Sequence, residues 1–257
     1  MEVFLNPSAW IALLTLTFLE IVLGIDNIIF ISIATGKLPT EKRKKATQIG
    51  LFLAMFLRIA LLMGISVLIA MKEAWITINL SWFTAEITGQ SLILFLGGLF
   101  LLYKSTTEIR EKIEEKGVEE KQLKKSAANR FSKVLIQIML IDLVFSFDSI
   151  LTAVGMTNGV EGAIYIMVTA VVISVFVMMQ FALPVGIFVN KHPTIQILGL
   201  AFLVLIGFML ITEAAHLASA SFFGNHVDVV PKGYLYFAIS FSLLVEVLNM
   251  KMKKNKT

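Results

Sequence analysis

The stretch LTFLEIVLGIDNIIF (residues 16–30) places two acidic residues, Glu20 and Asp26, within an otherwise strongly apolar segment. Apolar runs of about 17–25 residues are long enough to cross a bilayer as a helix. Of the 257 residues, 57% are hydrophobic and only 16% are charged, whereas soluble domains carry about 25% charged residues. The composition therefore predicts a membrane protein, and the acidic pair is expected to lie at membrane depth.

The same length criterion predicts seven transmembrane helices and an all-α polytopic fold. These helices are expected at residues 9–34, 48–71, 87–103, 133–156, 162–189, 194–215 and 233–249. We expect the chain (1–257) to form a single transmembrane domain with a cytoplasmic linker at 104–132. The first basic residue, Lys37, follows a complete apolar segment, so no cleavable signal peptide is expected.

Basic residues are distributed unevenly over the connections between the predicted helices. All but three of the 22 lie after the first, third and fifth helices or in the C-terminal tail. An excess of Lys and Arg marks the cytoplasmic side of a membrane protein. The N-terminus is therefore predicted outside and the C-terminus in the cytoplasm of a bacterial inner membrane. Because topology explains the positive charge, no nucleic-acid partner is expected.

An internal repeat relates the first stretch to IQIMLIDLVFSFDSIL (136–151). A shift of 122 residues aligns Glu20 with Asp142, Asp26 with Asp148, Asn27 with Ser149, and Arg58 with Gln180. We therefore predict two three-helix repeats, 9–109 and 133–216, followed by the seventh helix at 233–249. Because each repeat has an odd number of helices, the copies are inverted, as in many transporters with sites near the membrane midplane.

The four intramembrane acids predict a cation site. A carboxylate at a helix centre costs about 2.5–3.5 kcal/mol on insertion scales, so bound cations, protons or a fixed basic partner must offset the cost. Oxygen ligands suit Mn, Mg and Ca, and the chain has no cysteine. The predicted metal ligands are Glu20, Asp26, Asn27, Asp142, Asp148 and Ser149, with Arg58 and Gln180 as candidate charge partners or gates.

The opposite directions of the two acidic helices predict two layers of carboxylates. Glu20 is expected level with Asp148, and Asp26 level with Asp142. Six residues of α-helix rise about 9 Å, which separates the layers by that distance.

Residues six apart also point about 120° apart around a regular helix. We therefore hypothesise that the helices unwind locally, at Gly24 in the first repeat and at Ser146 in the second. Unwinding would let both acids of a helix face one cavity and would expose backbone carbonyls as further ligands.

The sequence resembles the TerC family of bacterial membrane proteins over nearly its whole length. The resemblance is carried by FLEIVLGIDNIIFIS (18–32), LGGLFLLYKSTTEI (96–109), QIMLIDLVFSFDSILTAVG (137–155) and VPKGYLYFAISFSLLVE (230–246). The chain is most similar to short members, which lack the cytoplasmic domains of longer ones. The resemblance implies a seven-helix fold related to the LysE transporter superfamily. It also implies manganese export, in some members linked to metalation of exported enzymes, with the four acids as the family's acidic residues.

We therefore expect a secondary transporter that exports a divalent cation across the inner membrane, with proton coupling as one option. The residues themselves indicate only a hard divalent cation, and manganese comes from the resemblance. The cation and the lipid bilayer are the expected partners, and no prosthetic cofactor or enzymatic activity is expected.

Other functions stay open at this point. They are an amino-acid exporter, a non-transporting partner in the metalation or secretion of exported proteins, and a membrane enzyme, for which no nucleophile–base arrangement stands out. Association with secretion machinery or with further copies of the chain also stays open.

Overall fold

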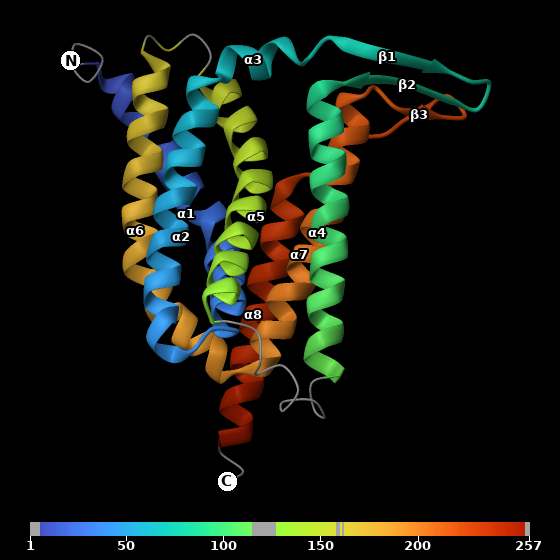
Figure 1. Ribbon diagram of the computed structural model, residues 1–257. Coiled ribbons are helices and arrows are strands. Elements are labelled where there is room, and N and C mark those ends of the chain that lie inside the picture. Colours follow the sequence, from blue (N-terminus) through green and yellow to red (C-terminus); the bar gives the residue numbers. More distant parts are fainter. Residues whose placement is uncertain (1–5, 115–126, 158–159, 161, 255–257) are drawn as a thin grey trace. The chain divides into compact units, whose positions relative to one another are not determined.

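The computed structural model describes residues 6–114, 127–157, 160 and 162–254 (Figure 1). The chain divides into two compact units. The first unit comprises residues 1–69 and 121–191, and the second comprises residues 70–120 and 192–257. The predicted single domain is not tested by this division. The predicted linker 104–132 lies partly outside the described residues.

The first unit is built from four long helices and one short one: α1 (Pro7–Gly36), α2 (Thr40–Met63), α3 (Ile65–Ala70, at the unit boundary), α5 (Ala127–Met156) and α6 (Ala163–Lys191). Asn6 caps α1 by accepting a hydrogen bond from the backbone N–H of Ser8 at 3.1 Å, which satisfies a free donor of the first turn. α1 packs mainly against α6, and α2 packs against α5 and α6. Helices of the two predicted repeats therefore alternate within this unit.

The second predicted helix, expected as one segment over 48–71, is interrupted. α2 ends at Met63, Gly64 follows, and α3 continues from Ile65. The N–H of Gly64 donates to the carbonyl of Ala60 at 3.0 Å and so closes the last turn of α2. Glycine is a weak helix former, which explains the position of the break.

The second unit contains three long helices: α4 (Gly89–Glu114), α7 (Pro193–Leu217) and α8 (Lys232–Lys254). Both α4 and α8 pack against α7, and the contact between α4 and α7 is the more extensive. The unit also carries a small antiparallel sheet in the order β1-β2-β3-β4, made of β1 (Ala74–Asn79), β2 (Phe83–Thr88), β3 (Ser221–Phe222) and β4 (Asn225–His226). No strands were predicted from the sequence, although β-branched and aromatic residues, which favour strands, are frequent in β1 and β2.

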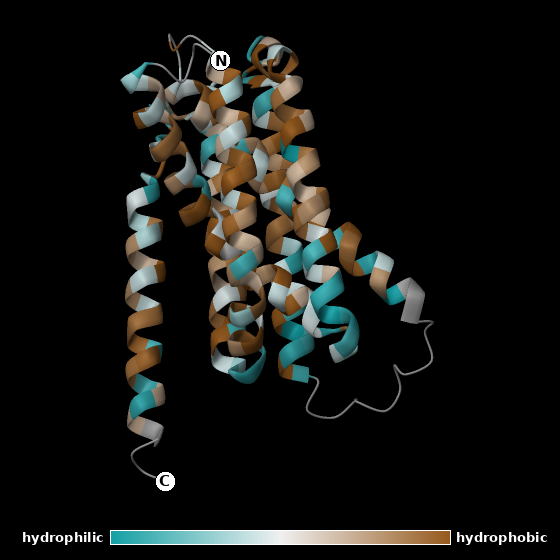
Figure 2. Ribbon diagram, turned by 90° about the vertical axis from the view of Figure 1, so that its left-hand side faces the viewer, coloured by the Kyte–Doolittle hydropathy of each residue, from teal (hydrophilic) through white to brown (hydrophobic). Residues whose placement is uncertain are grey.

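Seven of the described helices are long and apolar enough to cross a membrane: α1, α2, α4, α5, α6, α7 and α8. Large apolar side chains on α1 are 65–68% exposed, at Ile11, Leu14 and Phe18. Hydrophobic residues cover much of the long helices, and hydrophilic ones gather near their ends (Figure 2). Exposed apolar faces of this extent suit contact with lipid. The all-α polytopic fold is confirmed, while the inverted repeat and the orientation stay predictions.

Gly98 and Gly207 bring α4 and α7 together in the second unit. A Cβ atom on Gly98 would lie 2.7 Å from the carbonyl oxygen of Gly207, and one on Gly207 would lie 3.0 Å from that of Gly98. Small residues at helix crossings allow close backbone approach in membranes. The contact therefore depends on glycine at both positions.

Replacing Gly98 with Ala is expected to destabilise the protein by about 1–3 kcal/mol, the usual cost of overpacking. The obstacle is the backbone of α7, which cannot turn aside as a flexible side chain can. The free energy of unfolding in lipid bicelles measures the effect. Gly233→Ala is the matched control, because a Cβ at Gly233 would meet nothing within 4 Å. Equal stabilities for the two variants would contradict the packing argument.

Candidate functional site

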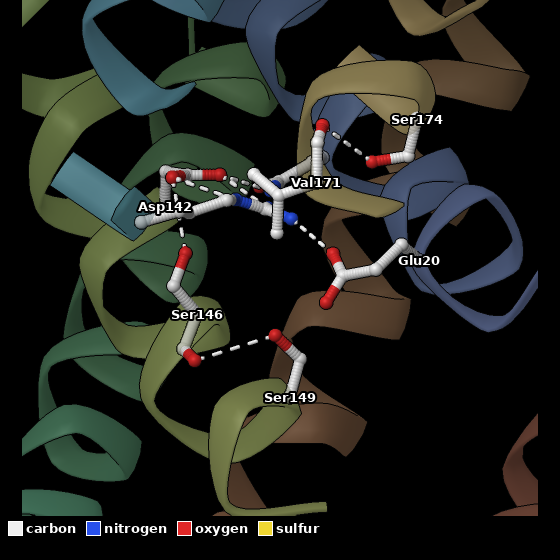
Figure 3. Close-up of polar contacts among 8 residues, drawn as sticks. Glu20, Asp142, Ser146, Ser149, Val171 and Ser174 are labelled. Atoms are coloured by element: carbon white, nitrogen blue, oxygen red, sulfur yellow. Dashed lines mark hydrogen bonds and ion pairs between the residues drawn. The ribbon is translucent and has the colours of Figure 1, made fainter. Parts of the chain in front are cut away.

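An ionic cluster lies in the interior of the first unit, where three helices each contribute one side chain. Glu20 comes from the middle of α1, Arg58 from α2 and Asp142 from the middle of α5. Their exposed fractions are 6%, 4% and 2%. The guanidinium of Arg58 contacts both carboxylates, and Figure 3 shows where Glu20 and Asp142 lie in the cluster.

Arg58 binds both acids at once. Its Nη1 donates to Oε2 of Glu20. Its Nη2 donates to Oδ1 of Asp142 at 2.6 Å, and its Nε donates to Oδ2 of the same carboxylate at 3.2 Å. This two-pronged contact with Asp142 uses the planar fork of the guanidinium, which matches a carboxylate. A fixed basic partner therefore offsets these two acids in the structure.

Asp142 also accepts hydrogen bonds from two neutral side chains. Asn27 Nδ2 donates to Oδ1 at 2.7 Å, and Ser146 Oγ donates to Oδ2 at 3.1 Å. Ser149 lies nearby on α5, where its Oγ donates to the carbonyl of Ser146 at 3.3 Å (Figure 3). Asp142 is thus the centre of the polar network, with contacts to α1, α2 and its own helix.

The surroundings of Glu20 leave little room for solvent. A cavity of about 10 Å³ borders its side chain and is otherwise lined by apolar residues of α1, α2, α5 and α6: Leu16, Leu62, Ile150, Ala153, Met167, Ala170 and Val171. A water molecule needs at least about 10–15 Å³ of such volume. The cluster is therefore buried, and the cavity beside Glu20 has space for about one water molecule at most.

The other predicted site residues are placed less centrally. Asp148 is half-buried, and its backbone carbonyl accepts a hydrogen bond from Thr152 Oγ1 at 3.1 Å. The side chain of Asp26 lies outside the described residues, although its backbone belongs to α1. Gln180, the predicted counterpart of Arg58, is exposed on α6 and is not part of the cluster.

These contacts bear on only part of the prediction that the four carboxylates lie in two layers. Arg58 joins Glu20 to Asp142, which the layer prediction assigned to different levels. Asn27, the neighbour of Asp26 in the sequence, contacts Asp142, as expected if Asp26 and Asp142 lie at the same level. The arrangement in layers stays a prediction.

The expected unwinding of the acidic helices is wrong. α1 is helical without interruption through Gly24, and α5 is helical through Ser146. A Cβ on Gly24 would collide with the sulfur of Met178 on α6. Gly24 therefore permits close packing of α1 on α6, and Ser146 supports Asp142 through a side-chain hydrogen bond.

No group of three or more His, Asp or Glu side chains close enough to hold a metal ion occurs among the described residues. Because the side chain of Asp26 is outside this set, the predicted ligand group is not tested as a whole. Within the described part of the cluster, Arg58 contacts both carboxylates.

Two polar contacts were not anticipated from the sequence. Ser146 supports Asp142 from one turn along α5, a spacing at which helical side chains meet and which could have revealed the pair. In the second unit, Glu108 on α4 is only 1% exposed and forms an ion pair with Lys104 at 2.7 Å. The same four-residue spacing of opposite charges indicates this pair.

A family model described as the integral membrane protein TerC family matches residues 5–257. The chain belongs to the TerC family. This TerC protein is 45% identical over 250 residues to a UPF0053 protein of Haemophilus influenzae, covering 97% of this chain and 96% of the relative. It is 47% identical over 251 residues to the UPF0053 inner membrane protein YgdQ of Escherichia coli, with coverages of 97% and 96%.

A longer relative matches through part of its length. The UPF0053 inner membrane protein YoaE of Escherichia coli is 42% identical over 255 residues, which cover 99% of this chain and 45% of YoaE. No solved structure matches the chain. Relatives named as inner membrane proteins and seven apolar helices together make this TerC protein a multi-pass inner membrane protein.

Proposed function

We propose that this TerC protein is a secondary transporter that exports a divalent metal cation, with manganese as the first candidate. The observation that carries the proposal is the buried cluster of Glu20, Arg58 and Asp142 within membrane-spanning helices. Two carboxylates share one guanidinium, so with both acids ionised the cluster has an excess negative charge. Buried charge is costly unless it is paired, and ionisable groups in membrane helices mark ion pathways.

The chemistry of the surrounding side chains supports a hard cation. In addition to Glu20 and Asp142, the proposed ligands are Asp26, Asp148 and the neutral groups of Asn27 and Ser149, all of which offer oxygen. Oxygen ligands suit Mn²⁺, Mg²⁺ and Ca²⁺, and the family resemblance favours manganese. In this proposal the cation is substrate, the protein has no prosthetic cofactor, and it is not an enzyme.

The small size of the cavity beside Glu20 favours a metal ion over an amino acid. The cavity beside Glu20 measures about 10 Å³, whereas pockets for small organic molecules are typically about 300–1,000 Å³. An amino-acid substrate would therefore require a larger rearrangement of the first unit than a bare cation.

Mn²⁺ flux into proteoliposomes tests the proposal. Wild-type protein is expected to carry Mn²⁺ at a rate that follows an imposed pH gradient, because the buried acids can take up protons in place of the cation. The double variant Asp26→Asn/Asp148→Asn is expected to lower the flux to that of empty liposomes. Asp228→Asn is the matched control, since Asp228 lies in the connection before α8. Full flux in the double variant would contradict the proposed role of these two acids.

A second candidate function is a non-transporting partner in the metalation or secretion of exported proteins. It is favoured by one observation: Arg58 pairs with Glu20 and Asp142 as a purely structural network would. Well-folded wild type that moves no divalent cation, with or without a gradient, would favour this function over transport.

A further inference from the structure

Arg58 lies where a bound cation would have to interact with Glu20 and Asp142. Three of its nitrogens donate to these two carboxylates, one of which belongs to α1 and the other to α5. In the sequence alignment of the repeats these two acids are equivalent, whereas the counterpart of Arg58 is Gln180, which is uncharged and exposed. The single positive charge of Arg58 therefore pairs with one acid from each of the two predicted repeats.

The charge of Arg58 is permanent, because arginine is not deprotonated in proteins. A second cation cannot take both carboxylates while the guanidinium holds them, since like charges at such close range repel strongly in a medium of low dielectric constant. Any ion that binds Glu20 and Asp142 together must therefore displace Arg58.

We propose that Arg58 is a built-in competitor that makes the site selective for ions of more than one positive charge. This inference rests on the proposed transport function. A monovalent ion would replace one positive charge with another while losing three charge-assisted hydrogen bonds, which are among the stronger ones in proteins. A divalent ion brings twice the charge and neutralises both acids, so its attraction to them is about doubled.

Arg58→Met removes the positively charged guanidinium that competes with the cation, and it keeps a long, unbranched side chain. Mn²⁺ is then expected to bind about tenfold more tightly or better, because no buried guanidinium has to be displaced from its partners. Na⁺ and K⁺ are expected to compete with Mn²⁺ in this variant, whereas they should have little effect on wild type. Competition of Na⁺ and K⁺ with Mn²⁺ is the decisive measurement, because replacing an arginine with a purely structural role would not change it.

Mn²⁺ binding to the full chain in lipid nanodiscs is measured from the electron paramagnetic resonance signal of free Mn²⁺, with and without added Na⁺ or K⁺. Arg43→Met is the matched control. Arg43 lies on the same helix, but its Nε and Nη2 donate to the backbone carbonyls of Leu38 and Gly36 at 2.8 and 2.9 Å. This control is expected to behave as wild type in both affinity and monovalent competition.

Arg58→Lys is the second variant and carries the test if Arg58→Met does not fold. Lysine keeps the charge but lacks the planar fork that binds Asp142 through two nitrogens, so Mn²⁺ binding should tighten by less than in Arg58→Met and Na⁺ should still not compete. Unchanged Mn²⁺ affinity in the folded Arg58 variants, together with Mn²⁺ transport by wild type, would overturn the competitor role alone. Absence of both Mn²⁺ binding and Mn²⁺ flux in wild type and Arg58→Met would overturn the transport function as well.

Discussion

Asp142→Asn is expected to reduce divalent-cation flux by at least about 100-fold, since changing even a partner of a metal ligand commonly costs 10–100-fold. Asp142 accepts from Arg58 through two nitrogens, from Asn27 and from Ser146. An asparagine side chain has one acceptor oxygen and presents N–H donors toward a guanidinium that also only donates. The variant therefore loses the anion and also breaks the network that positions Arg58.

Flux in proteoliposomes, normalised to the amount of folded protein, measures this effect. Asp228→Asn makes the same chemical change outside the membrane-spanning helices and should retain the wild-type rate. Retention of clearly more than about a hundredth of the wild-type flux by Asp142→Asn would show that this acid is not a direct cation ligand, because the loss would then be no larger than that of a supporting residue.

Arg58→Gln is expected to destabilise the protein more than the double variant Arg58→Gln/Asp142→Asn. Removing one partner of a buried ion pair costs about 3–5 kcal/mol, because the remaining charge is left buried without compensation. In Arg58→Gln both carboxylates lose their guanidinium, whereas the double variant leaves Glu20 as the one carboxylate of the cluster. The interaction energy between the two sites should lie near the upper end of the usual range of about 0.5–3 kcal/mol.

A double-mutant cycle on the free energy of unfolding in bicelles gives this energy. The control cycle combines Arg43→Gln with Asp142→Asn, because Arg43 binds the backbone carbonyls of Leu38 and Gly36 near the end of α1. Effects in the control cycle should add within about 0.5 kcal/mol. Additive effects in the Arg58 cycle as well would mean that the ion pair contributes no net coupling.

The membrane spans were predictable because insertion into lipid depends mainly on the length and hydrophobicity of a segment. All seven predicted spans correspond to long helices of the structure. β3 and β4 were missed because strands of two residues leave no periodic pattern in a sequence, whereas the β-branched and aromatic residues of the six-residue strands β1 and β2 were an available signal. The break at Gly64 was missed because a single glycine is tolerated in many helices.

The candidate site was predicted in its residue types but not in its pairings. Sequence alone offered cations, protons or Arg58 as partners for the acids, and only packing of α2 beside α1 and α5 selects the arginine for Glu20 and Asp142. The exposure of Gln180 depends in the same way on how α6 is rotated in the unit. Helix unwinding at Gly24 was expected because it would let both acids of α1 face one cavity. In the structure the helix stays intact, and Gly24 packs against Met178.

The three charges of the cluster are made at different times during synthesis. Arg58 follows Glu20 by 38 residues, but Asp142 follows Arg58 by 84 residues. At about 5–20 residues per second, the ribosome needs roughly 4–17 s to reach the second carboxylate. In that interval residues 70–120 of the second unit are also made, and Glu20 is the only cluster partner yet available to Arg58. We therefore expect the ion pair with Glu20 to be the first contact of the cluster that Arg58 can form, before the completed site exists.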